Sequence, residues 1–231
     1  MIAHPQLTSR DYESNYYKEH ADAGLDYLIH GSWHQSYAAM VTESTFQTSY
    51  ANPFVLDAGC VCGSILKGFK DLQAFSQVFG IDLSAYMVAL GRKEFGFTHE
   101  ELVAGSIAKI PALSESVSLL HSTQVLEHIP EELIDRVVDE FVRVLRPGGR
   151  AFLCMPALRE GEMKQMYMGD PTHVNIQPAH YWNDLFHKKN LVFDLEAYNH
   201  YARSRRGPNP KVERSFYQSY DRWNVWILLR R

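Results

Sequence analysis

The stretch VLDAGCVCGS, from Val55 to Ser64, joins an apolar run to a glycine-containing turn and then to the amphipathic segment SILKGFKDL. This order predicts a buried strand that turns directly into a helix. Gly59 allows a sharp turn because it carries no Cβ, and Gly63 opens the next helix close to the sheet. Such a turn at the end of a parallel strand is typical of a nucleotide-cofactor site, although Val61 stands where a middle glycine is usual.

The segments around this turn alternate between apolar strands and amphipathic helices. Strand–helix–strand units of this kind predict an α/β, Rossmann-like fold with helices on both faces of a mostly parallel sheet. We expect seven strands, the last of them antiparallel, and a well-defined helix over 131–146 that ends at Pro147-Gly148-Gly149. The seven predicted strands are PFVLDAG, QVFGIDLS, ELVAGS, VSLLHST, RAFLCMP, LVFDLEAY and RWNVWILL.

The chain of 231 residues, 45% of them hydrophobic, is long enough for one large domain over 1–231. Residues 1–50 lack strand alternation and are rich in aromatics, which predicts a helical N-terminal lid. Residues 52–157 form the expected cofactor-binding half, and 158–231 supply a substrate-side loop, centred on 157–177, and the C-terminal strands.

Composition narrows the class of protein. With 23 Lys and Arg against 27 Asp and Glu, the net charge of -4 argues against nucleic acid as a partner. No apolar run approaches the length of a membrane span, and no leader is evident. The three cysteines form no disulfide framework, so we expect a cytoplasmic protein. We expect it to be a monomer or a homodimer. His30 and His34 have a chelating spacing but no recognisable further ligands, and we predict no metal. The arginines of 203–206 are expected to be solvated.

Asp82 closes the second predicted strand, where an acidic side chain can accept both ribose hydroxyls of an adenosine. Asp57 precedes the glycines of the first turn, where a carboxylate would repel the pyrophosphate of a dinucleotide. It could instead hold the ammonium group of an amino acid, directly or through water. Asp57 therefore favours S-adenosylmethionine over NAD.

At this point the sequence resembles class I S-adenosylmethionine-dependent methyltransferases, especially the branch that acts on small molecules. The resemblance is strong over 55–157 and looser over 169–191. The motifs that carry it, in order, are VLDAGCVCG, FGIDLS, VAGSIAKIP, SVSLLHSTQVLEHIP and VLRPGGRAFL.

The resemblance implies S-adenosyl-L-methionine as the cofactor and a small-molecule methyl acceptor as the substrate. It implies that the first turn lines the methionine and ribose part, that Asp82 takes the ribose hydroxyls and that Gln124 lies near the methionine end. Leu83, Ser106 and Ile107 would frame the adenine. The residues of the first turn are Asp57, Gly59, Cys60 and Gly63. Three positions depart from the family pattern: Val61 for glycine, and Ser106 and Ser118 for aspartate.

Two histidines are candidates for a general base, which is needed only if the acceptor must lose a proton. His128 follows the fourth strand, and its alternative role is to pack or cap the start of the helix at 131–146. His173 lies near Asp170 in the loop over the expected substrate mouth, and its alternative role is to fix that loop. We interpret Glu127 as a structural partner of neighbouring amides.

Three functions remain open on sequence grounds. The first is methyl transfer to oxygen, nitrogen or carbon of a small metabolite, such as a sugar or natural-product intermediate. The second is a non-catalytic cofactor-binding partner or regulatory subunit, motivated by the three departures. The third, an NAD-dependent oxidoreductase, is disfavoured by Asp57.

Overall fold

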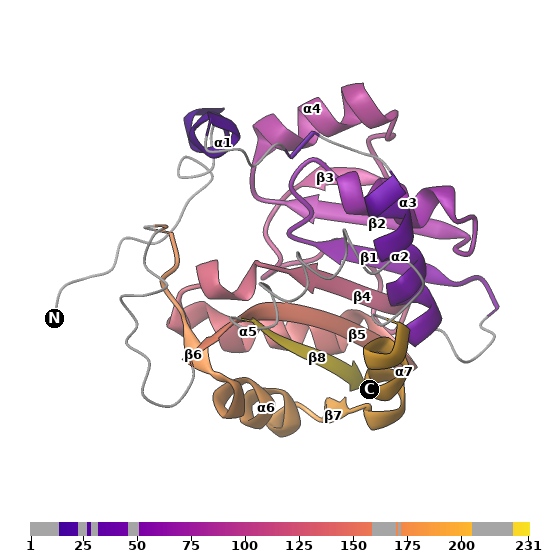
Figure 1. The fold of residues 1–231 in the computed structure, drawn as a ribbon, viewed down its shortest axis with the longest axis vertical. Helices are drawn as coiled ribbons and strands as arrows, with labels where there is room; N and C mark the ends of the chain where they lie inside the picture. The colour runs from indigo at the N-terminus through magenta and orange to yellow at the C-terminus, as the bar shows by residue number, and fades with distance from the viewer. Residues whose placement is uncertain are drawn as a thin grey trace, which may run out of the picture.

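The computed structural model is organised around one twisted sheet with helices on both faces (Figure 1). It describes residues 14–22, 27–28, 32–45, 51–158, 170, 172–204 and 224–231. The helices are α1 (Ser14–Asp22), α2 (Ser32–Thr45), α3 (Ser64–Asp71), α4 (Ala85–Phe95), the 3-10 turn η2 (Leu126–His128), α5 (Glu131–Val144), α6 (Ala179–Lys188) and α7 (Leu195–Ser204). The strands are β1 (Phe54–Ala58), β2 (Gln77–Asp82), β3 (Leu102–Ala104), β4 (Val117–Thr123), β5 (Leu145–Leu158), β6 (Gln177–Pro178), β7 (Val192–Phe193) and β8 (Asn224–Arg230).

The sheet has the order β3-β2-β1-β4-β5-β8-β7, and the short β6 pairs with β5 outside this path. Strands β3, β2, β1, β4 and β5 are parallel, which confirms the predicted α/β class. β8 runs antiparallel to both β5 and β7. The chain winds outward from β1 to β3 and then returns to the other side of β1 as β4, so the strand order reverses between β1 and β4. A ligand crevice in an open α/β sheet lies at such a reversal, outside the carboxyl ends of the strands.

Two separate apolar layers hold the helices against the sheet. On one face α5 contributes Ile134, Val138 and Phe141, with Trp182 of α6 beside them. On the other face the buried side chains come from α2, α3 and α7. The apolar stripe of the predicted helix at 131–146 therefore faces the sheet as its periodicity indicates, and the helix ends at Val144, where β5 begins.

The prediction of a strand over LVFDLEAY is wrong beyond its first residues. Only Val192–Phe193 forms a strand, and α7 begins at Leu195. The cause is Asp194, whose Oδ1 accepts the main-chain N–H of Ala197 at 3.0 Å and so caps the new helix. Its other oxygen accepts a hydrogen bond from Arg150 Nε of β5 at 2.7 Å, and both side chains are buried.

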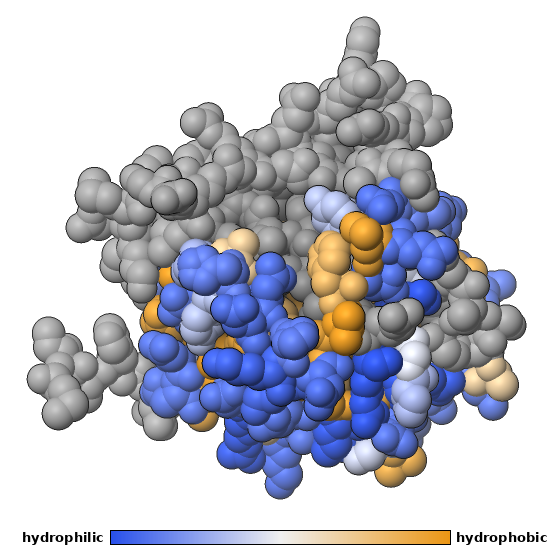
Figure 2. Space-filling model, turned by 90° about the horizontal axis from the view of Figure 1, so that it is seen from below, coloured by the Kyte–Doolittle hydropathy of each residue, from blue (hydrophilic) through white to orange (hydrophobic). Residues whose placement is uncertain are grey.

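The edge of the sheet at β7 carries exposed apolar side chains. Figure 2 views the molecule from this side and shows an apolar stripe between hydrophilic areas. The exposed large hydrophobic residues of the segment are Val192, Phe193, Leu195 and Tyr198. No helix in the ranges given above is long and apolar enough to cross a membrane.

Candidate active site

The carboxyl ends of β1 and β4 each carry a non-glycine residue in the left-handed region. Val61 has φ of 54° and Gln124 has φ of 55°. The other non-glycine residues with positive φ are exposed, whereas these two are partly buried at the strand reversal. A left-handed backbone is particularly costly for the β-branched Val61, and strain of this kind collects at functional sites. The left-handed backbone at these two positions therefore indicates a functional site at the same crevice that the sequence predicts after VLDAG.

The turn after β1 is tightly packed. Gly59 has φ of 77°, and a Cβ there would lie 2.4 Å from Val125 Cγ2. Gly63 has φ of 82° and precedes the first residue of α3. Cys60 and Cys62 are buried in the turn, and burial raises the pKa of Cys62 to about 12 and that of Cys60 well above its usual value. Both cysteines are therefore small packing residues rather than reactive thiolates.

Asp82 reaches from the end of β2 to the turn after β1. Its Oδ2 accepts the N–H of Val61 at 2.8 Å, and its Oδ1 accepts the N–H of Ser84 at 2.9 Å. Burial raises the pKa of this carboxyl, and the two amides offset part of the rise. Each oxygen keeps a second lone pair, so the carboxylate can accept two more donors from the crevice.

Asp57 is engaged inside the protein, which sequence reasoning missed. It lies beside His121 in the parallel register of β1 and β4, and its Oδ1 is 2.6 Å from His121 Nδ1. Asp57 is 3% exposed and His121 is 1% exposed. His121 Nε2 is in turn 3.0 Å from the Tyr37 hydroxyl of α2. One Asp57 oxygen is thus held by a buried imidazole. The sequence signal that could have indicated this contact is the histidine in the middle of the apolar strand VSLLHST.

Helix α1 lies at the edge of the sheet where the parallel strands end (Figure 1). Tyr17 packs with Cys62 and Met87 in a small apolar cluster. Burial, followed by the nearby Asp82 charge, raises the pKa of Tyr17. Tyr16 ties the helix to the far side of the crevice by donating its hydroxyl to Asp170 Oδ2 at 2.9 Å.

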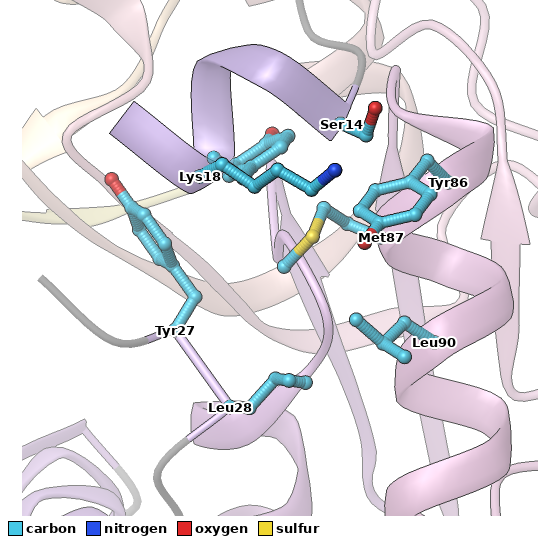
Figure 3. Close-up of a pocket in the computed structure, with 8 residues that line it drawn as sticks. Ser14, Lys18, Tyr27, Leu28, Tyr86, Met87 and Leu90 are labelled. Carbon is cyan, nitrogen blue, oxygen red and sulfur yellow. The ribbon is translucent and has the colours of Figure 1, made fainter. Parts of the chain in front are cut away.

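The pocket under α1 is small. Figure 3 shows its lining, with Tyr86, Met87 and Leu90 projecting from α4 toward Lys18 of α1. Its volume is about 140 Å³, which is below the roughly 300–1,000 Å³ of ordinary ligand pockets. The eight lining residues are Ser14, Tyr17, Lys18, Tyr27, Leu28, Tyr86, Met87 and Leu90.

The residues expected around an adenine lie on the β2–β3 side of the crevice. Leu83 is partly buried directly after Asp82, and Ile107 is buried. Ser106 is exposed, and its hydroxyl accepts the N–H of Ala108 at 3.2 Å. Ser118 lies far from this group in the interior of β4, where its hydroxyl accepts the N–H of Phe54.

His128 and His173 are brought together on the opposite side, after β4. Their ring centroids are 4.8 Å apart. His128 Nδ1 is 2.9 Å from Thr172 Oγ1, and that hydroxyl donates to Asp170 Oδ1 at 2.6 Å. Burial opposes ionisation of Asp170, but the hydrogen bonds from Thr172 and Tyr16 outweigh it and hold the pKa below its usual range. The Asp170 side chain reaches His128 through Thr172, and the Asp170 main-chain oxygen accepts the N–H of His173 at 3.1 Å. That Asp170 orients the His173 ring stays a prediction.

Glu127 departs from its expected structural role. The side chain is 0% exposed, and neither carboxylate oxygen has a hydrogen-bond partner. Burial raises the pKa of Glu127 to about 8, and the charge of Asp170 adds to the rise. Gln124 lies three residues earlier, and its main-chain N–H donates to the main-chain oxygen of Cys154 at 2.8 Å.

Some expected features fall outside the described residues. These are most of the loop at 157–177, His30, Arg205 and Arg206, and parts of the 1–50 segment.

Comparison with known proteins agrees with this arrangement. Residues 56–153 match the family model of the methyltransferase domain. A methyltransferase from Arabidopsis thaliana is 36% identical over 102 residues, covering 41% of this chain and 28% of that protein. The ubiquinone/menaquinone biosynthesis C-methyltransferase UbiE of Methylobacterium nodulans is 29% identical over 192 residues, covering 79% and 71%. The chain spans less than half the length of the first curated relatives it matches.

Solved structures share the fold. The geranyl diphosphate C-methyltransferase of Streptomyces coelicolor A3(2), solved with Mg²⁺, a substrate analogue and S-adenosyl-L-homocysteine, superposes with a TM-score of 0.62. It is 18% identical, and the match covers 85% of this chain and 75% of that one. The match of 56–153 to a methyltransferase domain agrees with the resemblance that the motifs indicate, and the solved structure shares the fold.

Proposed function

We propose that this chain, which carries a methyltransferase domain over 56–153, transfers a methyl group from S-adenosyl-L-methionine to a small molecule. The observation that carries the proposal is the position of Asp82. Its carboxylate ends β2, bonds the turn after β1 and retains acceptor capacity at the strand reversal. An acidic group in this place accepts the two hydroxyls of an adenosine ribose.

The residues present fit the cofactor on this side. Asp82 would hold the ribose, and Leu83 and Ile107 offer apolar surface to the adenine. The exposed Ser106 hydroxyl already accepts the N–H of Ala108. The main chain of Ser106 is therefore the better partner for the adenine edge. Asp57 has one oxygen held by His121, so it would meet the ammonium group of the cofactor through its other oxygen or through water.

We propose that helix α1 covers the cofactor end of the crevice. The Asp82 charge helps to raise the pKa of Tyr17 on this helix, and the hollow of about 140 Å³ lies between α1 and α4. Tyr17 and Tyr27 would then border the ligand, and their ring faces attract a sulfonium by about 1 kcal/mol or more once water is excluded. This is the lid role that we propose for the N-terminal helices.

The cofactor supplies an activated methyl group on a sulfonium. When bound, it would give that methyl to the acceptor atom, and the electron pair of the broken sulfur–methyl bond would stay on sulfur, leaving S-adenosyl-L-homocysteine. An oxygen or nitrogen acceptor also loses a proton, which we assign to His128. Its Nδ1 faces the carbonyl oxygen of Thr172 at 3.2 Å, an acceptor, so the ring nitrogen able to take the proton is Nε2.

Calorimetry with S-adenosyl-L-homocysteine tests the proposal. We expect one site on the wild-type chain and at least a tenfold loss of affinity in Asp82→Ala. Asp184→Asn, an exposed carboxylate change on α6, is the matched control and should bind as the wild type does. Absence of binding at high micromolar ligand would reject the proposal. Tight binding without turnover over a broad panel of acceptors would instead identify a non-catalytic partner protein.

A further inference from the structure

We propose that Glu127, His128 and His173 bind a divalent transition-metal ion, of which Zn²⁺ is the best match, at the acceptor side of the crevice. One ligand atom from each of the three side chains lies within 4.8 Å of the other two. The ion binding is independent of the proposed methyl transfer. Only its consequence for the acceptor rests on that function.

The strongest argument is the carboxylate of Glu127. A buried polar group without a hydrogen bond costs free energy, and a buried carboxylate without a counter-charge costs more. Glu127 is fully buried with both oxygens unpartnered, yet it lies beside two imidazoles rather than in a purely apolar pocket. A dication between these three side chains would supply the missing partner.

The hydrogen bonds around His128 prepare one nitrogen for a metal. The Thr172 hydroxyl donates its proton to Asp170, so it must accept the bond from His128 Nδ1. The carbonyl oxygen of Thr172, at 3.2 Å, also requires a donor at Nδ1. The neutral ring therefore carries its proton on Nδ1 and leaves a lone pair on Nε2. Protein metal sites commonly fix a ligating histidine through such a bond on its other nitrogen.

The ligand types select the class of ion. Two imidazoles and one carboxylate suit zinc and related first-row ions, whereas calcium and magnesium prefer oxygen ligands. Ligand atoms around a tetrahedral zinc lie about 3.4 Å apart, since each is about 2.0–2.2 Å from the ion. Small side-chain rotations would bring the three groups from their present separation to that distance.

Three protein ligands leave a coordination position open. Zinc sites of this composition bind water or substrate there and lower the pKa of the bound group. At the acceptor side of the crevice, the open position would suit an acceptor that bears a hydroxyl, thiol or carboxylate. The ion would then orient the acceptor and favour loss of its proton, in place of direct proton removal by His128.

The test is metal binding by the full, untagged chain after treatment with a chelator. Zn²⁺ is titrated against a competing chelator, and Co²⁺ is followed by its visible absorption. We expect one equivalent of either ion and a cobalt spectrum without the thiolate charge-transfer bands that cysteine ligands would produce. Glu127→Gln should lower the affinity at least 100-fold. Glu131→Gln, an exposed change in the first turn of α5, should leave it unchanged.

A second pair of variants tests the orienting hydroxyl. Thr172→Val removes the acceptor for His128 Nδ1 and should weaken Zn²⁺ binding about 10- to 100-fold. Thr172→Ser keeps the hydroxyl and should restore most of the affinity. Thermal unfolding of every variant separates loss of the site from loss of the fold.

Less than one equivalent of metal on folded wild type, or equal affinity in Glu127→Gln, would overturn the metal site. S-adenosyl-L-homocysteine binding is measured on the same samples. Metal binding without nucleoside binding would support the ion and reject the methyl transfer, and the reverse result would do the opposite.

Discussion

Replacing His121 with phenylalanine should destabilise the protein severely, because it leaves the buried Asp57 carboxylate without the hydrogen bond from His121. Phenylalanine keeps the aromatic packing, since the His121 ring already stacks on Phe152 with an interplanar angle of 17°. The substitution therefore removes the 2.6 Å hydrogen bond to Asp57 without opening a large cavity. What remains is a carboxylate that is 3% exposed and has lost its charge-assisted donor.

The magnitude follows from that burial. Removing one partner of a buried pair typically costs about 3–5 kcal/mol, because the other group is left without compensation. Tyr37→Phe removes only the hydroxyl on the far side of His121 and should cost about 1 kcal/mol. Asp57→Asn in the His121→Phe background removes the stranded charge and should recover part of the loss.

Urea unfolding followed by circular dichroism measures the free energy of unfolding of each variant. Wild type, His121→Phe, Asp57→Asn alone and the double variant form a cycle that isolates the Asp57–His121 coupling. If His121→Phe cost no more than Tyr37→Phe, Asp57 would not depend on His121. The carboxylate would then be available in full to a cofactor.

Two further results are expected. Burial raises the pKa of Asp82, and ribose hydroxyls need its ionised form. Calorimetric affinity for S-adenosyl-L-homocysteine should therefore fall as the pH is lowered through the raised pKa, at a higher pH than an ordinary aspartate would require. Asp82→Asn should bind weakly and without that pH dependence. Gly59→Ala combines a left-handed backbone with a clash against Val125 and should lower the free energy of unfolding by about 2–4 kcal/mol in urea. The control, Gly96→Ala, also has a left-handed backbone but no atom within 4 Å of the new Cβ, and it should cost about 1 kcal/mol. Equal losses in the two variants would contradict the packing argument.

Local patterns predicted the parallel half of the fold because each element there is specified by its own residues. The helix at 131–146 has a continuous apolar stripe, and β1 and β2 are apolar runs that end in an acid and a turn. LVFDLEAY failed because one side chain decides its fate. Asp194 caps a helix and pairs with Arg150, which lies 44 residues earlier in the chain. The cap is a local signal that the apolar pattern of the segment obscured, whereas the contact with Arg150 leaves no local signal.

The candidate site also contains features that local sequence predicts and features that depend on contacts between distant segments. Asp82 and the glycine turn follow from position along β1 and β2, whereas the Asp57–His121 bond depends on the register of β1 against β4. The Asp170–Thr172–His128 chain depends on a loop folding back over η2. Sequence spacing paired Asp170 with His173 because the two are close in the chain. In the structure the side chain of Asp170 bonds Thr172 and through it reaches His128, while its main-chain oxygen accepts the N–H of His173.

Val125 packs between the turn after β1, which is proposed to bind the cofactor, and the residues after β4 that are proposed to face the methyl acceptor. Its side chain occupies the space left by the absent Cβ of Gly59, and it lies between the left-handed Gln124 and the buried Glu127. A larger residue at Gly59 would therefore displace both sides of the crevice at once. Loss of activity in such a variant could not be assigned to either side. Asp82 bonds Val61 in the turn and Ser84 at the start of α4, and neither bond involves Val125. Asp82 is therefore the position at which cofactor binding can be tested without disturbing the acceptor groups.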